Sequence, residues 1–284
     1  MPTVPSAQPP AESHQASHQA REVAESFGAE AGRYDRARPS YPAALVERIV
    51  AASPGRRVLD VGCGTGIVAR LFQAAGCAVL GVDPDARMAG HARERGLEVE
   101  VATFETWATN GRAFDTIVSG QAWHWVDPVA GAAKAASALR PGGRLAVFWN
   151  VFQPPAELGK AIAEAYRRML PDLPSDRWDR PFLEIYETMG ARTADGMRQA
   201  GAFGEAEQWR FAWERPYTRD EWLEQVPTFG GFSRIPPGQQ EQILAGIGAA
   251  IDAAGGGFTM GFTTLAVTAA LAAPCGRSRL TSPA

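Results

Sequence analysis

The sequence predicts an α/β protein built around a doubly wound, mostly parallel sheet. Between residues 57 and 150, short apolar runs typical of buried strands alternate with longer segments of helical periodicity. A glycine-rich turn at 60–66 follows the first strand, and Asp83 ends the second strand. Ligands of such sheets bind at the carboxyl ends of the strands, so both features predict a binding site at that edge.

The alternating region is predicted to hold five strands and three helices. The strands are 57–61, 78–82, 98–101, 115–119 and 144–150, and the helices are 66–75, 85–95 and 128–139. Gly55 and the turn formed by Pro141, Gly142 and Gly143 separate elements where the chain must change direction. This alternation implies parallel strands with helices on both faces of the sheet.

The segment before the first strand is predicted to cover the binding site. Residues 21–30 and 43–52 have helical patterns, and 34–42 form a polar, aromatic connector stiffened by prolines. Such a connector can fold over the mouth of a cofactor site.

Residues 151–200 break the alternation and are predicted to form a helical insertion after the fifth strand, with helices at 156–170 and 182–189. The elements expected after the insertion are a strand at 205–216, helices at 218–225 and 239–253, and a closing strand near 258–264. Thr218 and Glu221 match the capping box that begins a helix.

The length and composition fit one large domain. The chain has 284 residues, of which 45% are hydrophobic and 21% charged. Residues 1–20, rich in Pro, Ser, Ala, Gln and His, predict a disordered tail. A single domain is expected over 21–284, made of an entry segment (21–52), a core (53–150), the insertion (151–200), later strands and helices (201–270) and a flexible tail (271–284).

Charge and hydropathy exclude several classes of partner. The net charge of −3 and the pI of about 5.9 give no support for a nucleic-acid or anionic-membrane partner. The apolar run at 258–273 contains four threonines and is shorter than the roughly 20 residues of a membrane span. A small-molecule partner is therefore expected.

Cysteine and histidine content predict a reducing compartment and no metal site. Cys63, Cys77 and Cys275 are odd in number and form no C-x-x-C pair, which favours the cytoplasm. His14 and His18 are spaced to share a helical face, but no third ligand accompanies them in the tail.

The glycine-rich turn carries the most specific signal. Asp60 is followed by Gly62, Gly64 and Gly66, which are spaced G-x-G-x-G. A side chain at any of the three would block positive φ or hold a ligand away from the main chain. A dinucleotide fingerprint requires G-x-G-x-x-G, and its last position here is Ile67. The spacing therefore disfavours a nicotinamide-dependent oxidoreductase.

This pattern resembles the first motif of class I S-adenosylmethionine-dependent methyltransferases, in their type 11-like, small-molecule branch. The resemblance covers about residues 34–150 in motif detail. It implies a Rossmann-like, seven-stranded sheet whose last strand is antiparallel, S-adenosyl-L-methionine as cofactor and a small molecule as methyl acceptor. The first alternative is a protein of this fold that binds the cofactor without catalysis, and the second is the oxidoreductase.

The resemblance assigns further cofactor positions near the second and third strands. Asp83 would accept hydrogen bonds from the ribose hydroxyls, while Asp85 caps the next helix. The alternative for Asp83 is the helix cap itself. Phe104 is expected to stack on the adenine, and Met88 to line the same pocket. For both, packing in the core is the alternative.

Two residues of the entry segment are also expected at the cofactor. Arg38 would pair bidentately with the methionine carboxylate, with Tyr34 beside it. Surface solvation is expected for Arg36.

The segment after the fourth strand, 120–128, gathers aromatic residues where the reactive methyl should emerge. Its Ala-Trp-His-Trp-Val-Asp pattern resembles methyltransferases related to the trans-aconitate and juvenile-hormone-acid enzymes. Gln121 is expected at the cofactor and Trp123 and Trp125 at the acceptor, although at least one tryptophan should fill the interface between sheet and helix. His124 is the candidate general base, and a histidine hydrogen-bonded inside the turn is the alternative.

Overall fold

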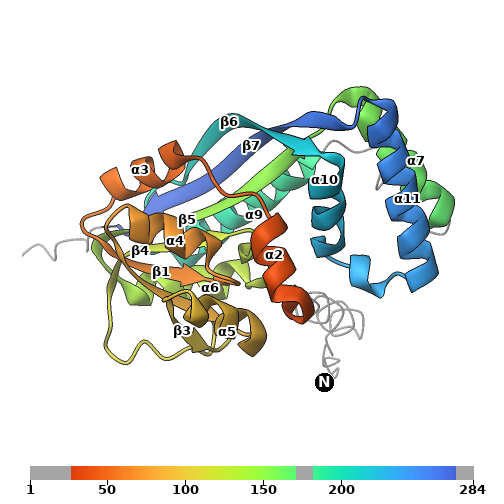
Figure 1. Cartoon of the computed structure of the whole chain (residues 1–284). Helices are drawn as coiled ribbons and strands as arrows, with labels where there is room; N and C mark the ends of the chain where they lie inside the picture. The colour runs from red at the N-terminus through yellow and green to blue at the C-terminus, as the bar shows by residue number, and fades with distance from the viewer. Residues whose placement is uncertain (1–26, 171–181, 273–284) are drawn as a thin grey trace, which may run out of the picture.

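A seven-stranded sheet runs through the computed structural model, which describes residues 27–170 and 182–272 (Figure 1). The strand order is β3-β2-β1-β4-β5-β7-β6. Neighbouring strands from β3 to β5 are parallel, and β7 is antiparallel to both β5 and β6. The predicted fold class is confirmed, because helices cover both faces of this mostly parallel sheet.

The elements follow the predicted order. The strands are β1 (Arg57–Val61), β2 (Ala78–Asp83), β3 (Glu98–Val101), β4 (Phe114–Gly120), β5 (Leu139–Gln153), β6 (Glu207–Thr218) and β7 (Gly257–Ala270). The helices are α2 (Ala31–Ala37), α3 (Ala43–Ala51), α4 (Ile67–Ala74), α5 (Ala86–Glu94), α6 (Pro128–Ala138), α7 (Ala156–Met169), α9 (Phe182–Ala200), α10 (Arg219–Gln225) and α11 (Pro237–Ala253). Short 3-10 turns are η1 (Phe27–Glu30), η2 (Trp123–Trp125), η3 (Val226–Thr228) and η4 (Phe232–Arg234).

Three elements, β5, α9 and β7, are longer than predicted, and the first two have a clear physical reason. The strand β5 begins at Leu139, and the predicted turn around Gly142 lies inside it, where the register with β4 shifts between Phe114 and Thr116. The helix α9 continues past Met189 because Gly190 is a packing residue: a Cβ there would lie 3.2 Å from Val267 of β7.

The entry segment is more helical than predicted. Tyr34 belongs to α2, which ends at Ala37, and the extended backbone of the C-cap residue Arg38 precedes Pro39. Proline disfavours a helical conformation in the residue before it, which explains this end point. Of the helix predicted at 21–30, residues 27–30 form η1, and residues 21–26 lie outside the described residues.

Several predictions fall outside the described residues. They concern the tail at 1–20 with His14 and His18, and Cys275 in the segment after 272. Within the described residues, no helix is long and apolar enough to cross a membrane.

Apolar side chains fill both faces of the sheet. On one face, α6 and α9 cover a core that includes Leu59, Ile117 and Trp149. On the other face, α3 and α4 cover Val58 and Phe148. This double packing holds the carboxyl ends of β1, β2 and β4 rigidly at one edge.

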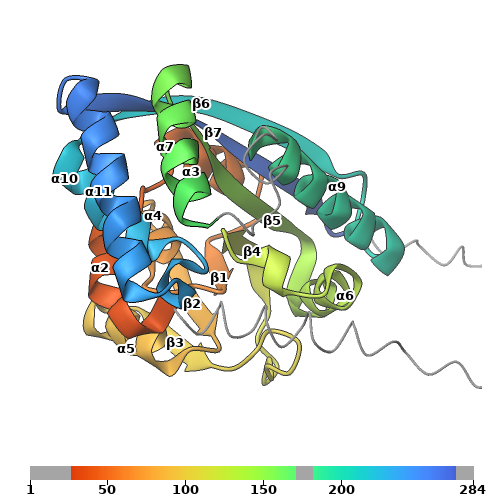
Figure 2. The same ribbon diagram turned by 90° about the vertical axis from the view of Figure 1, so that its right-hand side faces the viewer.

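A third apolar core lies where β5, β6 and β7 extend beyond the parallel strands. Three helices, α7, α10 and α11, pack there around residues such as Trp222, Ile243 and Phe262 (Figure 2). We call these helices, with η3 and η4, the cap. The predicted capping box is confirmed at the start of α10, where Thr218 and Glu221 bond reciprocally.

Candidate functional site

The glycine turn leaves its backbone open at one position. Gly62, Gly64 and Gly66 have φ of +67°, +54° and +85°, which side chains rarely permit. A Cβ on Gly62 would lie 2.4 Å from that of Ala122, so protein packing already requires this glycine. At Gly64 the nearest atom to such a Cβ is the methyl of Met88, at 3.6 Å. Gly64 is therefore the point where a ligand can approach the main chain.

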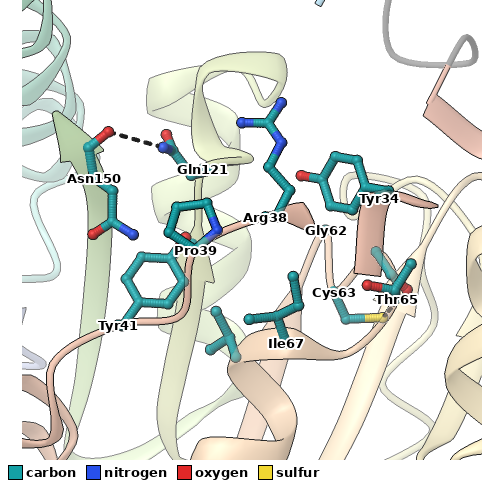
Figure 3. Close-up of a pocket in the computed structure, with 13 residues that line it drawn as sticks. Tyr34, Arg38, Pro39, Tyr41, Gly62, Cys63, Thr65, Ile67, Gln121 and Asn150 are labelled. Carbon is teal, nitrogen blue, oxygen red and sulfur yellow. Dashed lines mark hydrogen bonds between the residues drawn. The ribbon is translucent and has the colours of Figure 1, made fainter. Parts of the chain in front are cut away.

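A hollow opens beside this turn, between the entry segment and the ends of β4 and β5 (Figure 3). Five of the residues predicted to bind a cofactor line it, namely Tyr34, Arg38, Gly62, Gly64 and Gln121. The other lining residues are Pro39, Tyr41, Cys63, Thr65, Ile67, Val68, Gly120 and Asn150.

Asp83 stands at the tip of β2 and shapes the glycine turn. Its Oδ2 accepts a hydrogen bond from the N–H of Gly64 at 2.8 Å, and its Oδ1 accepts one from the N–H of Asp85 at 2.9 Å. Burial raises the pKa of Asp83 to about 6. The side chain of Asp85 accepts a hydrogen bond from the backbone N–H of Arg87 and so caps α5. The prediction that Asp85 is the N-cap of this helix is confirmed.

Asp60 is an enclosed carboxylate beneath the turn. It has no exposed surface, and neither oxygen has a hydrogen bond of normal length, although the N–H of Ala69 gives weak support. Burial, and then the neighbouring Asp83, raise the pKa of Asp60 to about 8. An enclosed acid without a partner is costly to the fold, and a cation bound nearby would remove that cost.

Met88 and Phe104 occupy different surroundings. Met88 is buried with its methyl facing Gly64, so it backs the turn. Phe104 is buried in the core cluster of the α6 and α9 face, against Trp107 and Trp123. Core packing, the alternative that the sequence left open, describes Phe104 in this structure.

The aromatic segment after β4 divides its residues between core and surface. Trp123 is buried in the core, as expected for at least one of the two tryptophans. Trp125 keeps 39% of its surface exposed, and its ring lies 4.5 Å from that of His124. None of the three lines the hollow. Apolar surroundings lower the pKa of His124 to about 4, even though the residue is exposed at the surface.

The entry helix α2 joins the core to the cap. Asp35 accepts a hydrogen bond from Arg70 at 2.7 Å and lies 3.1 Å from the Nε of Arg95. Burial raises the pKa of Asp35, but the hydrogen bonds from Arg70 and Thr65 and the charges of Arg70 and Arg95 together outweigh burial, so the pKa of Asp35 is lowered. On the opposite side, Arg36 pairs with Glu224 of α10 at 3.1 Å.

Residues far apart in the sequence complete the site. Tyr186 of α9 is hydrogen-bonded to Gln121, and Thr228 of the cap accepts a hydrogen bond from Arg38. The sequence did not predict these contacts, because no local pattern links partners so distant. Asn150 was also missed, although a polar residue within an apolar strand run is a usable signal. Within the described residues, no group of three metal-ligating side chains occurs.

The fold and the glycine turn define a methyltransferase. Residues 34–185, more than half of the chain, match the family model of the methyltransferase domain. The chain belongs to this family, as the resemblance of its glycine motif predicted.

Curated relatives agree with this assignment. The chain is 40% identical over 133 residues to an uncharacterised methyltransferase of Mycobacterium tuberculosis, covering 46% of this chain and 54% of that one. It is 34% identical over 146 residues to the trans-aconitate 2-methyltransferase of Mycolicibacterium gilvum, covering 50% and 52%. The chain thus spans about half the length of the curated relatives it matches.

A solved structure from Anaeromyxobacter dehalogenans, provisionally described as a type II methyltransferase, has a TM-score of 0.59 at 24% identity. It covers 82% of this chain and 97% of its own. The likeness supports the Rossmann-like methyltransferase fold.

Proposed function

We propose that the protein transfers a methyl group from S-adenosyl-L-methionine to a small-molecule acceptor. The observation that carries the proposal is the open backbone at Gly64, with Asp83 at the next strand tip and the enclosed Asp60 beneath it. When bound, this cofactor supplies a methyl group activated by its sulfonium.

The residues around the turn fit such a molecule. Each oxygen of Asp83 uses one lone pair on the backbone and keeps another for a ribose hydroxyl. Asp60 lacks a counter-charge, so a ligand ammonium near it would favour its ionised form. Tyr34 and Tyr41 present aromatic surface to the hollow, and such surface favours cationic groups.

We propose that the acceptor is oriented beside the cofactor, next to the hollow. Holding two reactants in line supplies a large part of the acceleration for a methyl transfer. Relatives named for trans-aconitate and for ubiquinone biosynthesis favour small acceptors over macromolecules. We further propose that residues 21–284 form one domain, and that the free Cys63 and Cys77 reflect a cytoplasmic location.

Calorimetry tests the proposal directly. S-adenosylmethionine and its demethylated product S-adenosylhomocysteine are expected to bind the full chain, and NAD is not. Binding of NAD alone would favour the oxidoreductase. Binding of S-adenosylhomocysteine without methylation of any carboxylic acid, phenol or amine would leave a non-catalytic binding protein.

A further inference from the structure

The strand β6 is the outermost strand of the sheet and has a free edge. Among the described strands it pairs only with β7, over 12 residues, and in Figures 1 and 2 it forms the upper rim of the sheet. The N–H of Arg219, directly after β6, bonds to the carbonyl of Gly256 and so faces β7. Because backbone groups alternate in direction along a strand, the even-numbered residues of β6 present theirs to the outer edge. Such an edge is a template for another strand.

The middle of this edge is open and carries two charges of opposite sign. Arg210, Ala212 and Glu214 are exposed and hold the free backbone groups. Arg210 pairs with Glu187 of α9 at 2.7 Å, whereas Glu214 pairs with no described side chain. Pro216 is also even-numbered, so its missing N–H falls on the outer edge and leaves the ladder with β7 intact.

The side chains along β6 are self-complementary about Ala212. Arg210 lies two residues before Ala212 and Glu214 two residues after it, on the same face of the strand. Phe211 and Trp213 flank Ala212 on the opposite face. When two β6 strands pair antiparallel with their centre at Ala212, each Arg210 lies opposite Glu214 of the second copy. Each Phe211 then lies opposite Trp213, and both kinds of cross-strand pair stabilise a sheet.

Other registers of the two strands lack this match. A centre at Arg210 or at Glu214 places two like charges directly opposite each other, which is destabilising. A centre at Phe211 or Trp213 places both charged residues opposite uncharged ones. The charge pattern therefore favours the register centred at Ala212.

The aromatic side chains of β6 are ordered within a single chain. Trp213 donates from Nε1 to the Oγ1 of Thr264 at 2.8 Å, and its ring stacks on Phe262 with the centroids 4.1 Å apart. Phe211 packs at the margin of the core beneath α3 and α4. Both aromatic residues are only partly buried, so each keeps surface for a further contact. Pairing would cost little side-chain entropy, because these rings are already held.

We propose that two copies of the chain pair through β6, antiparallel and centred at Ala212, and form a homodimer with one continuous sheet. Each copy contributes the free N–H and C=O groups of Arg210, Ala212 and Glu214 to the shared ladder. A strand without this charge pattern would leave Arg210 and Glu214 without opposite charges, so the edge selects its own copy. The dimer is independent of the proposed reaction, because no residue of β6 lines the hollow.

The mass of the full chain in solution tests the dimer. Light scattering over a concentration series is expected to show the mass rising from 30.3 kDa toward twice that value. Added salt should weaken the dimer, because its charge pairs are exposed. A mass of 30.3 kDa at every concentration would overturn the proposal.

A charge exchange tests the contact between the copies. Arg210→Glu places like charges opposite each other at two symmetric positions and should weaken the dimer at least about tenfold. The double variant R210E/E214R exchanges the two charges and should restore the dissociation constant to within about threefold of the wild type. Neither variant restores the pair with Glu187, so recovery reports only the contact between copies.

The matched control for the charge exchange is Arg198→Glu. Arg198 is an exposed arginine further along α9, paired with Asp195, and its replacement should leave the dimer unchanged. A dimer that is insensitive to Arg210→Glu, or that does not recover in the double variant, would contradict the proposed contact.

Cysteine substitutions test the register. Ala212→Cys places two thiols on the two-fold axis, with Cα atoms about 5.5 Å apart, a separation that a disulfide can span. Gln208→Cys is the control, because it lies on the same edge and face but opposite Pro216 of the second copy. We expect oxidation to cross-link Ala212→Cys at least about tenfold faster than Gln208→Cys or the wild type. Equal rates for the two variants would overturn the pairing centred at Ala212.

Discussion

The carboxylate of Asp83 accepts a hydrogen bond from the backbone N–H of Gly64, so the tip of β2 fixes the centre of the glycine turn. The same carboxylate also holds the N–H of Asp85 at the start of α5. Two neighbouring strands are thereby locked together where a ligand would contact both. A residue assigned to ligand binding from the sequence is, in the structure, also a scaffold for the turn.

Replacement of Asp83 should therefore remove more than a ligand contact. We expect Asp83→Ala to weaken S-adenosylhomocysteine binding by about 2 to 4 kcal/mol, through lost ribose hydrogen bonds and a loosened turn. Calorimetry measures the affinity. Asp85→Ala is the matched control, because it removes a helix cap two residues away and should lower stability by about 1 kcal/mol while affinity is retained. An unchanged affinity in Asp83→Ala would reduce Asp83 to a structural residue.

A valine at Gly64 should block ligand binding, whereas a valine at Gly96 should not. Both residues have positive φ, +54° and +82°, and a Cβ on Gly96 would meet no atom within 4 Å. Valine at either position strains the backbone by at least about 1 to 2 kcal/mol. We expect both variants to melt earlier but only Gly64→Val to lose S-adenosylhomocysteine binding. Equal affinities would refute the argument that a ligand approaches the backbone at Gly64.

The enclosed carboxylate of Asp60 should make stability depend on pH. Its folded pKa of about 8 exceeds the ordinary value of about 4, so the folded protein retains a proton that the unfolded chain releases. The contribution of Asp60 to the free energy of unfolding is then most favourable below about pH 4, falls as pH rises toward 8 and levels off above that. The buried Asp83, with its pKa raised to about 6, adds to this fall in the same direction.

Asp60→Asn isolates the contribution of Asp60. The variant cannot ionise, so its melting temperature should exceed that of the wild type by a few degrees at pH 8.5 and match it near pH 4.5. Asp115→Asn is the control, because Asp115 is equally buried but hydrogen-bonded to Arg57 and Arg140. Asp115→Asn should lower the melting temperature at pH 8.5, because it weakens these two hydrogen bonds. A lower melting temperature of Asp60→Asn at pH 8.5 would mean that the carboxylate has partners in solution.

The entry segment should be required for ligand retention. Removal of residues 1–41 deletes Tyr34, Arg38 and Tyr41 from the hollow, together with the Asp35 anchor on Arg70. We expect this truncation to weaken S-adenosylhomocysteine binding at least tenfold, whereas removal of residues 1–20 should change it little. Calorimetry measures the affinity of each truncated chain for S-adenosylhomocysteine. Equal affinities would show that the entry segment is only a connector.

The sequence was most informative where the chemistry is local. The glycine spacing from Gly62 to Gly66 and the acid at Asp83 predict both the turn and its place in the sheet, because each depends on residues adjacent in the chain. The position of the cap over the site could not be predicted from adjacent residues. Arg38 meets Thr228 across 190 positions, and only tertiary packing sets that contact. Phe104 illustrates a further limit, since an aromatic residue at a strand end fits a ligand pocket and a core equally well.

His124 provides the sharpest separation between two catalytic schemes. The sulfonium already activates the methyl group and His124 lies outside the lining of the hollow, so His124→Ala should retain kcat within about tenfold. Its lowered pKa of about 4 keeps the imidazole neutral above pH 6, so ionisation of His124 should produce no rise in kcat near pH 6.5. Steady-state kinetics on the wild type, His124→Ala and His124→Asn measure both effects. If Ala and Asn each lower kcat about 100-fold or more, His124 is the general base that its position after β4 indicated. If only Ala is damaging, the ring is a hydrogen-bonding part of the turn, because asparagine can bond but cannot accept the proton.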